Sequence, residues 1–257
     1  MEIRQNSTSQ FCKISSEQFD ADFTSLRETF REKKIDLIRI PKLLEKPKLF
    51  VFDMDSTLIH QEVIDELARA HGVYEEVAKI TAEAMNGGLD FAAALQKRVA
   101  ALKGLEIETF QKVYRSLTLQ SGVLELFQFL KKHETKIIVL SGGFSPILEM
   151  FQKEYGITEF KANHLKNVKG IFTGEIEGEI IDSIAKKKYT LEFASQFKIP
   201  IEEVVVVGDG ANDSLMIKTT PFGFGFHAKE GLKKQITNWF DFSPMNVLES
   251  LFETTWT

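Results

Sequence analysis

The pattern of hydrophobic and polar positions predicts a sheet of buried parallel strands. Residues 49–52, 136–140 and 203–207 contain continuous apolar runs rather than alternating ones, which is typical of strands covered on both faces. Residues 222–226, FGFGF, supply one further strand. Stretches with helical spacing separate these strands. We therefore expect an α/β protein with a doubly wound, mainly parallel sheet.

The first 46 residues have a different pattern. Apolar residues with the spacing of one helical face lie between two short strand-like stretches, at 11–14 and 35–40; the helical residues are Phe19, Phe23, Leu26 and Phe30. We interpret residues 1–46 as a small N-terminal β-α-β appendage that serves packing or dimerisation, so a homodimer stays open. Pro41 and Pro47 bracket the boundary with the main domain, residues 47–257.

A long helical segment follows the first core strand. From residue 61 to about 124 the spacing is helical, with a break at Asn-Gly-Gly, 86–88. An insertion at this point predicts a helical cap that can act as a lid over the strand end. Residues 47–60 and 125–257 would then form the core. Within the core, glycines separate alternating segments at 163–182, which indicates a small β-hairpin flap.

Polar residues gather where three of the predicted strands end. In open parallel sheets this edge is where ligands bind. Asp53 and Asp55 follow the first strand, a Ser-Gly-Gly turn follows the second, and GDGAND follows the third. Carboxylates beside a buried strand are costly unless a cation or hydrogen bonds compensate, and hard oxygen ligands suit Mg²⁺. The other candidates at these ends are Ser141, Gly142, Gly143, Asp209, Asn212 and Asp213.

Each of these signals alone also has an ordinary structural interpretation. An Asp-x-Asp pair after a strand is more often a loop or a helix cap, and a Ser-Gly-Gly turn is as often a plain strand-to-helix connection. Lys186 opens a run of three lysines, which usually marks a solvated helix face. The acid pair, the Ser-Gly-Gly turn, the lysine and GDGAND in this fixed order are a much stronger signal of a phosphate site.

Composition narrows the classes of partner. The 257 residues carry 32 basic and 37 acidic side chains, a net charge of −5, which gives no bulk attraction for nucleic acid or anionic lipid. The single cysteine, Cys12, excludes an intramolecular disulfide and fits a reducing cytosol. No stretch has the apolar length of a membrane span, and the N-terminus lacks an apolar signal core. We therefore expect a soluble cytoplasmic protein with a small-molecule substrate, and neither nucleic acid nor membrane as partner.

The motifs FDMDSTL, VLSGGF and VGDGANDSLM, with a lysine before the last, resemble those of the haloacid dehalogenase-like phosphatases. Within them, FDMDSTLIHQEVIDELA and FTGEIEGEI resemble the phosphoserine phosphatase family. The resemblance runs from Pro47 to about Lys229, and KEGLKKQITNWF departs from the usual wording. It implies a Mg²⁺-dependent enzyme that converts O-phospho-L-serine to L-serine and phosphate, the last step of serine biosynthesis.

The chemistry of a phosphate monoester dianion gives each motif a role. Asp53 is the expected nucleophile, forming an aspartyl-phosphate, and Asp55 is the expected general acid and then base. The Asp53 and Asp209 side chains and the Asp55 carbonyl oxygen would bind Mg²⁺, while Asp213 would hold the metal's waters or orient the lysine. The phosphoryl oxygens would be held by Ser141, the Gly142 amide, Lys186 and Asn212.

The resemblance also implies that the cap recognises the amino-acid end of the substrate through Glu62 and Arg98. Arg98 follows Phe91 by seven residues and shares its apolar helix face, so a snorkelling side chain is the alternative. Met85 and Phe91 would close an apolar wall of the pocket, or belong to ordinary cap core. Two other functions stay open: a phosphatase or phosphotransferase for another small phosphomonoester, and a non-catalytic phosphate-sensing module.

Overall fold

The computed structural model describes residues 2–5, 10–13, 23–85 and 87–255. In this part of the chain seven strands form one sheet in the order β6-β5-β4-β3-β7-β8-β9. Neighbouring strands are parallel except for β6, which runs antiparallel to β5. Their bounds are β3 (Leu49–Phe52), β4 (Lys136–Phe144), β5 (Glu159–Val168), β6 (Ile171–Glu177), β7 (Val204–Gly208), β8 (Phe222–Phe226) and β9 (Trp239–Phe240). The predicted mainly parallel sheet is confirmed.

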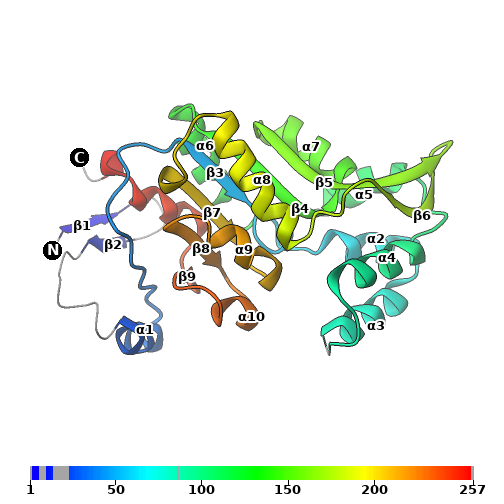
Figure 1. The fold of residues 1–257 in the computed structure, drawn as a ribbon, viewed down its shortest axis with the longest axis horizontal. Coiled ribbons are helices and arrows are strands. Elements are labelled where there is room, and N and C mark those ends of the chain that lie inside the picture. Colours follow the sequence, from blue (N-terminus) through cyan, green and yellow to red (C-terminus); the bar gives the residue numbers. More distant parts are fainter. Residues whose placement is uncertain (1, 6–9, 14–22, 86, 256–257) are drawn as a thin grey trace.

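Helices cover both faces of the sheet (Figure 1), which explains the continuous apolar runs. Phe50 and Phe52 join one core cluster with α6 (Val123–Lys132) and α7 (Ser145–Tyr155), while Leu49 and Val51 join a second cluster on the other face. Helices of the second face are α8 (Ser183–Gln196), α9 (Ser214–Ile217) and α10 (Glu230–Lys233). Short 3₁₀ turns complete the core: η2 (Ile201–Glu203), η3 (Ala211–Asp213), η4 (Met245–Leu251) and η5 (Glu253–Thr255).

Four helices form the predicted cap between β3 and α6: α2 (Val63–His71), α3 (Tyr74–Met85), α4 (Phe91–Ala101) and α5 (Glu108–Ser116). Two chain segments connect them to the core, and these segments pair with each other. The His60 N–H donates to the Thr118 carbonyl at 3.0 Å, and the Gln120 N–H donates to the Leu58 carbonyl at 2.9 Å. This short two-stranded connection forms the base of the cap.

The β5–β6 hairpin is the predicted flap, and its far end reaches the cap. Backbone hydrogen bonds of 2.9 Å join the turn after α4 to the hairpin, from Gly104 to the Phe172 carbonyl and from Phe172 to the Leu105 carbonyl. Gly174 has φ 86°, and a Cβ there would lie 3.1 Å from the Lys103 Cβ, so glycine permits this close approach. The cap is therefore held by its base and by the flap.

The predicted β-α-β order of residues 1–46 is wrong in its second strand, while the strand predicted at 11–14 and the later part of the helix are present. The structure has an antiparallel hairpin, β1 (Glu2–Gln5) and β2 (Gln10–Lys13), then α1 (Phe23–Glu32), and no strand at 35–40. The expected earlier helical turns, including Phe19, lie at 14–22, outside the described residues.

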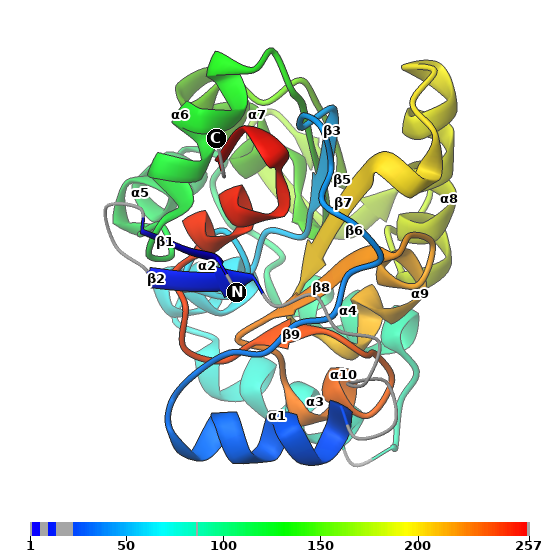
Figure 2. The same ribbon diagram turned by 90° about the vertical axis from the view of Figure 1, so that its left-hand side faces the viewer.

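Side chains rather than a strand ladder hold residues 35–40 against the core, because the neighbouring β9 is only two residues long. The Asn238 amide bonds to both the N–H and the carbonyl of Arg39, each at 2.8 Å. The Asp36 carboxylate accepts three backbone N–H groups after β9, from Asp241, Phe242 and Ser243. Figure 2 shows α1 on the side of the core that carries β9. The N-terminal segment lies at the opposite end of the molecule from the cap (Figure 1).

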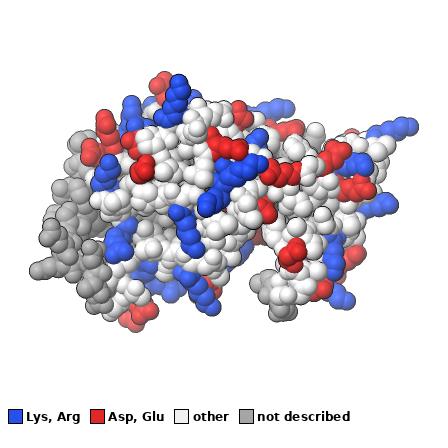
Figure 3. Space-filling model, viewed as in Figure 1, with Lys and Arg blue, Asp and Glu red and all other residues white. Residues whose placement is uncertain are grey.

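Basic and acidic side chains are intermixed over the face seen in Figure 3, with neither sign forming an extended patch. No helix in the described ranges combines the length and the apolar character that a membrane crossing requires.

Candidate active site

The candidate site begins where β3 ends. The N–H of Asp53 donates to the Val207 carbonyl at 2.9 Å, which extends the β3–β7 pairing by one residue. Ser56 has a left-handed backbone, φ 58°, and the chain turns there toward the cap. Between them, the Asp55 carboxylate accepts a 3.2 Å hydrogen bond from the N–H of Val63 at the start of α2. The acid pair therefore lies at the junction of sheet and cap.

Lys186 reaches this junction from the first turn of α8. Asp182 caps that helix by accepting two backbone N–H groups, at 2.9 and 2.8 Å, so the first turn is fixed beside the sheet edge. The Lys186 Nζ lies 2.5 Å from Asp53 Oδ1 and 2.7 Å from Asp213 Oδ1, and its side chain is fully buried. The solvated-face interpretation is therefore wrong for Lys186, although the next residue, Lys187, is exposed as that interpretation requires.

The GDGAND loop folds around the Asp213 side chain. Asp213 Oδ2 accepts the N–H groups of Asp209, at 3.1 Å, and Gly210, at 3.0 Å, while Oδ1 faces the buried lysine. A Cβ at Gly208 would lie 2.5 Å from the Asp213 Cγ, so only glycine leaves room for the carboxylate beneath the loop. Both carboxylate oxygens of Asp213 are thus engaged by protein donors, which favours the lysine-orienting alternative over a role in holding water.

Burial raises the pKa of each of the three acids that face the cavity. For Asp53, burial and the nearby Asp213 charge raise the pKa well above its ordinary value. For Asp55, burial and then the Glu62 charge raise the pKa to about 8. Burial raises the pKa of Asp209 to about 6. A cluster of this kind is stable as anions only with cations beside it.

The donor set fits Mg²⁺. Carboxylate oxygens of Asp53, Asp209 and Asp213 lie within 4.8 Å of one another, and all three residues are buried. The cluster offers only hard oxygen ligands, without thiolate or imidazole, which is the set that Mg²⁺ takes. Asp213 is engaged through both of its oxygens, whereas a lysine reaches one oxygen of Asp53 and one of Asp209. Asp53 and Asp209 are therefore the side chains that would hold the ion.

The end of β4 packs against the acid pair. The Gly143 N–H donates to Ser141 Oγ at 2.8 Å, and the Asn163 side chain on β5 donates to the Gly142 carbonyl at 2.8 Å. A Cβ at Gly143 would lie only 3.0 Å from Asp55 Oδ2. The Ser-Gly-Gly turn is therefore shaped to the side chains at the end of the neighbouring strand.

The cap supplies the other wall. Glu62, which precedes α2, accepts a 2.9 Å hydrogen bond from Ser56 Oγ, and the Arg98 Nε donates to the Ala94 carbonyl one helical turn earlier, at 3.4 Å. The core and the cap together enclose a cavity of about 130 Å³. Nine predicted residues line it: Asp53, Asp55, Glu62, Phe91, Arg98, Gly142, Gly143, Asp209 and Asn212.

The other predicted residues lie beneath or beside this cavity. Three of them, Ser141, Lys186 and Asp213, are buried beneath the cavity. Each contacts a residue that lines it: Ser141 contacts Gly143, Lys186 contacts Asp53, and Asp213 contacts Asp209. Met85 is the last residue of α3, and its side chain lies outside the described part of the structure. The strand ends and the cap thus bring together predicted residues that are up to 160 positions apart in the sequence, from Asp53 to Asp213.

Comparison with known proteins identifies the lineage of this site. Residues 47–219 match the model of the haloacid dehalogenase-like hydrolases. The chain belongs to this family. Most of the candidate site falls within the matched residues, from Asp53 to Asp213, so the acid pair, the Ser-Gly-Gly turn, the buried lysine and the GDGAND loop are features of a family member.

Individual relatives of this family member include phosphoserine phosphatases. The chain is 45% identical to that of Archaeoglobus fulgidus over 186 residues, 72% of this chain but only 54% of the archaeal protein. It is 42% identical to that of Streptococcus thermophilus over 187 residues, 73% of this chain and 87% of the relative. A solved structure of a substrate-bound phosphoserine phosphatase superposes with TM-score 0.75 at 37% identity, covering 81% of this chain and 100% of that one.

Three cavity-lining residues were not predicted: Ile64, Leu95 and Lys229. Leu95 lies on α4 with the predicted Phe91 and Arg98, and Ile64 lies in the first turn of α2, two residues after the predicted Glu62, so their positions were a usable signal. Lys229 follows β8, the neighbour of β7 in the sheet. The rule that parallel strands end at one edge could have identified it.

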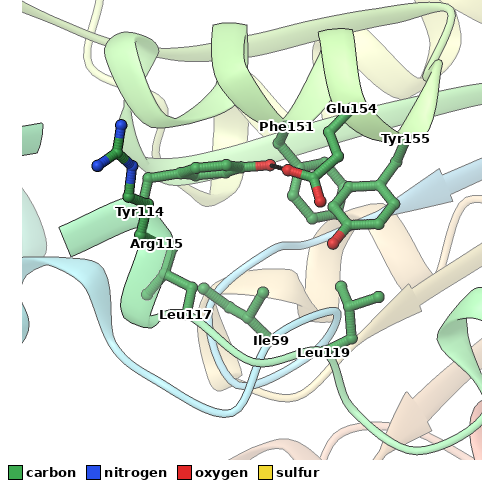
Figure 4. Close-up of a pocket in the computed structure, with 8 residues that line it drawn as sticks. All are labelled: Ile59, Tyr114, Arg115, Leu117, Leu119, Phe151, Glu154 and Tyr155. Atoms are coloured by element: carbon green, nitrogen blue, oxygen red, sulfur yellow. Dashed lines mark hydrogen bonds between the residues drawn. The ribbon is translucent and has the colours of Figure 1, made fainter. Parts of the chain in front are cut away.

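A second cavity, of about 260 Å³, lies at the base of the cap and contains none of the predicted residues. Figure 4 shows it between α5, α7 and the segments that connect cap and core. Within it Tyr114 donates a 2.6 Å hydrogen bond to Glu154, which links the cap to the core away from the acid pair.

Proposed function

We propose that this family member is a Mg²⁺-dependent phosphatase that hydrolyses O-phospho-L-serine through an aspartyl-phosphate, as in the last step of serine biosynthesis. The observation that carries the proposal is the buried contact of Lys186 with both Asp53 and Asp213, directly beneath a cavity that Asp53 lines and that Glu62 and Arg98 border from the cap. The named phosphoserine phosphatases among the relatives support the choice of substrate.

Asp53 is the proposed nucleophile. Its Oδ1 faces Lys186 and its Oδ2 lies 3.5 Å from Thr57 Oγ1, so the carboxylate is oriented before substrate arrives. An oxygen of Asp53 attacks phosphorus, and the bond from phosphorus to the serine oxygen breaks. Ser141, the Gly142 amide, Lys186 and Asn212 are proposed to hold the phosphoryl oxygens while this occurs.

Asp55 is the proposed general acid and base. Burial and Glu62 raise its pKa to about 8, so the side chain holds a proton near neutral pH and can give it to the departing serine oxygen. It then takes a proton from the water that attacks the aspartyl-phosphate. Two carboxylates one residue apart are thereby assigned to two different roles.

Asp53, Asp209 and the Asp55 carbonyl oxygen are the proposed Mg²⁺ ligands. When bound, the ion would offset the charge of the phosphate dianion and of the carboxylates around it. Asp213 contributes by holding Lys186 and the Asp209 backbone in position.

The cap is proposed to select the amino acid. The Arg98 guanidinium would pair with the substrate carboxylate and Glu62 with its ammonium, over an apolar wall that includes Phe91 and Leu95. Met85 is kept as a proposed part of that wall. Residues 47–257 are proposed as the phosphatase domain and residues 1–46 as an appendage to it, while a cytoplasmic location and a homodimer stay predictions.

The test is phosphate release from a panel of phosphomonoesters with the purified chain and Mg²⁺. O-phospho-L-serine should be the preferred substrate, and removing divalent ions with a chelator should abolish turnover until Mg²⁺ is restored. An Asp53→Asn variant purified in parallel controls for contaminating phosphatases. Preference for a phosphomonoester without an amino-acid end would contradict the substrate, and full activity after exhaustive chelation would contradict the metal.

A further inference from the structure

Lys229 enters the cavity although no role in catalysis or in substrate recognition has been given to it. Its backbone N–H donates to the Asp209 carbonyl at 2.8 Å, which ties the segment after β8 to the GDGAND loop. His227, two residues earlier, has a left-handed backbone with φ 44°, and the chain bends there over the strand ends. The backbone thus directs the Lys229 side chain over the strand-end edge of the sheet.

The Lys229 ammonium joins the two halves of the site. Its Nζ lies 2.9 Å from Asp209 Oδ2 and 3.0 Å from Glu62 Oε1. Among the ion pairs of the described residues, the one with Glu62 is alone in connecting the core to the cap segment. Although burial would raise the pKa of Glu62, Lys229 holds it below the ordinary value. Glu62 is therefore an anion that already has a cationic partner.

That partner has the chemistry of the group that Glu62 is proposed to bind. A lysine side chain ends in a compact ammonium with three donors, as does the α-amino group of an amino acid. Glu62 Oε1 already accepts from both Ser56 Oγ and Lys229 Nζ. A second ammonium brought to the same carboxylate would lie next to the first, and the two like charges would repel.

We propose that Lys229 occupies the ammonium position of the substrate in the free enzyme, and that the α-ammonium of phosphoserine replaces it on Glu62. This proposal rests on the proposed function. It makes Lys229 a specificity-determining residue. A ligand with an ammonium exchanges one ion pair for another, whereas a ligand without one leaves Lys229 in place.

The exchange reduces what the substrate ammonium contributes to affinity, and removing the lysine should reveal the full contribution. The probes are 2-amino-4-phosphonobutanoate, a phosphonate that copies phosphoserine and cannot be hydrolysed, and 4-phosphonobutanoate, which lacks only the ammonium. Calorimetric titration of the intact chain with Mg²⁺ gives a Kd for each. Loss of the Lys229 charge affects the phosphonate and the carboxylate of both probes alike. The ratio of the two Kd values therefore isolates the contribution of the ammonium.

In Lys229→Met the Kd of 4-phosphonobutanoate divided by the Kd of 2-amino-4-phosphonobutanoate should rise by roughly fivefold. This is the size expected for an ion pair between partly exposed side chains. The two side chains are 58% and 41% exposed, which is why the effect is modest. Lys234→Met, the same substitution at an exposed neighbour, should leave the ratio at the wild-type value. In a Glu62→Gln background, Lys229→Met should no longer change it.

An unchanged or lower ratio in Lys229→Met would overturn the proposal, because Lys229 would then not compete with the substrate ammonium for Glu62. A ratio that still rises in the Glu62→Gln background would overturn it too, since the effect would not pass through Glu62. If the wild-type chain neither hydrolyses phosphoserine nor binds the amino probe, the proposed function fails and this inference fails with it. Hydrolysis of phosphoserine together with an unchanged ratio overturns the exchange alone.

Discussion

The strand-end half of the site and the cap half are built differently. At the strand ends, Asp53, Lys186 and Asp213 are buried, and each is held by contacts of 3.1 Å or less that come from the protein itself. In the cap, Glu62 is 41% exposed, and Arg98 makes its hydrogen bond to a carbonyl of its own helix. The groups proposed for chemistry are fixed by buried contacts, whereas those proposed for recognition are held less tightly: Glu62 is partly exposed with Lys229 as its present partner, and Arg98 bonds to its own helix.

This difference follows from what each half has to do. Charged groups stabilise a transition state best when they are oriented before the reaction and shielded from water. Recognition groups that a separate cap contributes complete the site only when the correct ligand arrives. Changes at the strand ends should therefore affect every phosphomonoester, and changes in the cap should affect only substrates with an amino-acid end.

The largest expected effect is that of Asp53→Asn. Removing the nucleophile should lower turnover of both phosphoserine and p-nitrophenyl phosphate by on the order of 10⁴-fold or more, because neither substrate has another route to a covalent intermediate. Steady-state phosphate release measures it, and circular dichroism checks that the variant is folded. Near-normal turnover of either substrate by a folded variant would show that the nucleophile is another residue.

Asp55→Asn should have the next largest effect, on the order of 10²- to 10⁴-fold for phosphoserine, since both proton transfers are lost. The loss should be smaller for p-nitrophenyl phosphate, whose phenolate leaves without a proton, so its first step should survive better than its second. Rapid-mixing kinetics should then show a burst of nitrophenolate before a slow steady state. Equal first-step losses for the two substrates would argue against Asp55 as the general acid.

Arg98→Ala tests the cap half. Leaving the substrate carboxylate without its partner should lower kcat/KM for phosphoserine by about 2 to 5 kcal/mol, roughly 30- to 5000-fold, with much less effect on p-nitrophenyl phosphate. Lys97→Ala, its exposed neighbour on α4, is the matched control and should change neither substrate. A similar loss on both substrates would mean that Arg98 serves the fold or the phosphate, and the comparison between the two halves would break down.

The sequence predicted the strand-end half better than the cap half, for physical reasons. A continuous apolar run such as residues 49–52 has few alternatives to a buried strand, and parallel strands end at one edge, so Asp53 and Asp209 had to lie close together. The helical spacing predicts that Arg98 lies on the apolar side of α4, but it does not predict which group the side chain meets there. That depends on how the cap packs on the core, which local periodicity does not contain.

The N-terminal segment shows the same limit. Residues 35–40 have strand-like spacing, yet the structure holds them through the side chains of Asp36 and Asn238. A strand needs a backbone partner of matching length, and the two-residue β9 does not offer one. Lys186 is the opposite case: its lysine-rich context suggests a solvated face, and only two buried carboxylates from other segments explain its full burial.

The smallest expected effect concerns Glu249, a half-buried acid outside both halves, and it sharpens the comparison because a lysine is not among the groups that shift its pKa. Glu249 lies in η4, where burial, and then the charge of Glu125, raise its pKa to about 7. Unlike Asp53, it has no lysine among the groups that shift its pKa. Because the folded-state pKa lies above the unfolded value, near 4.3, Glu249 favours the folded state below pH 4 and loses that contribution as pH rises to 7.

Glu249→Gln should therefore raise the Tm by about 1 to 3 °C at pH 8, where the wild-type side chain is a half-buried anion, and the gain should shrink toward zero near pH 4.5. Thermal denaturation at the two pH values measures this, and phosphatase activity should stay unchanged because Glu249 does not line the active-site cavity. Glu125→Gln removes the second cause alone and should give a smaller gain with the same pH dependence. A gain of equal size at both pH values would show that the substitution acts through packing, and that partial burial of this carboxylate costs the protein nothing measurable.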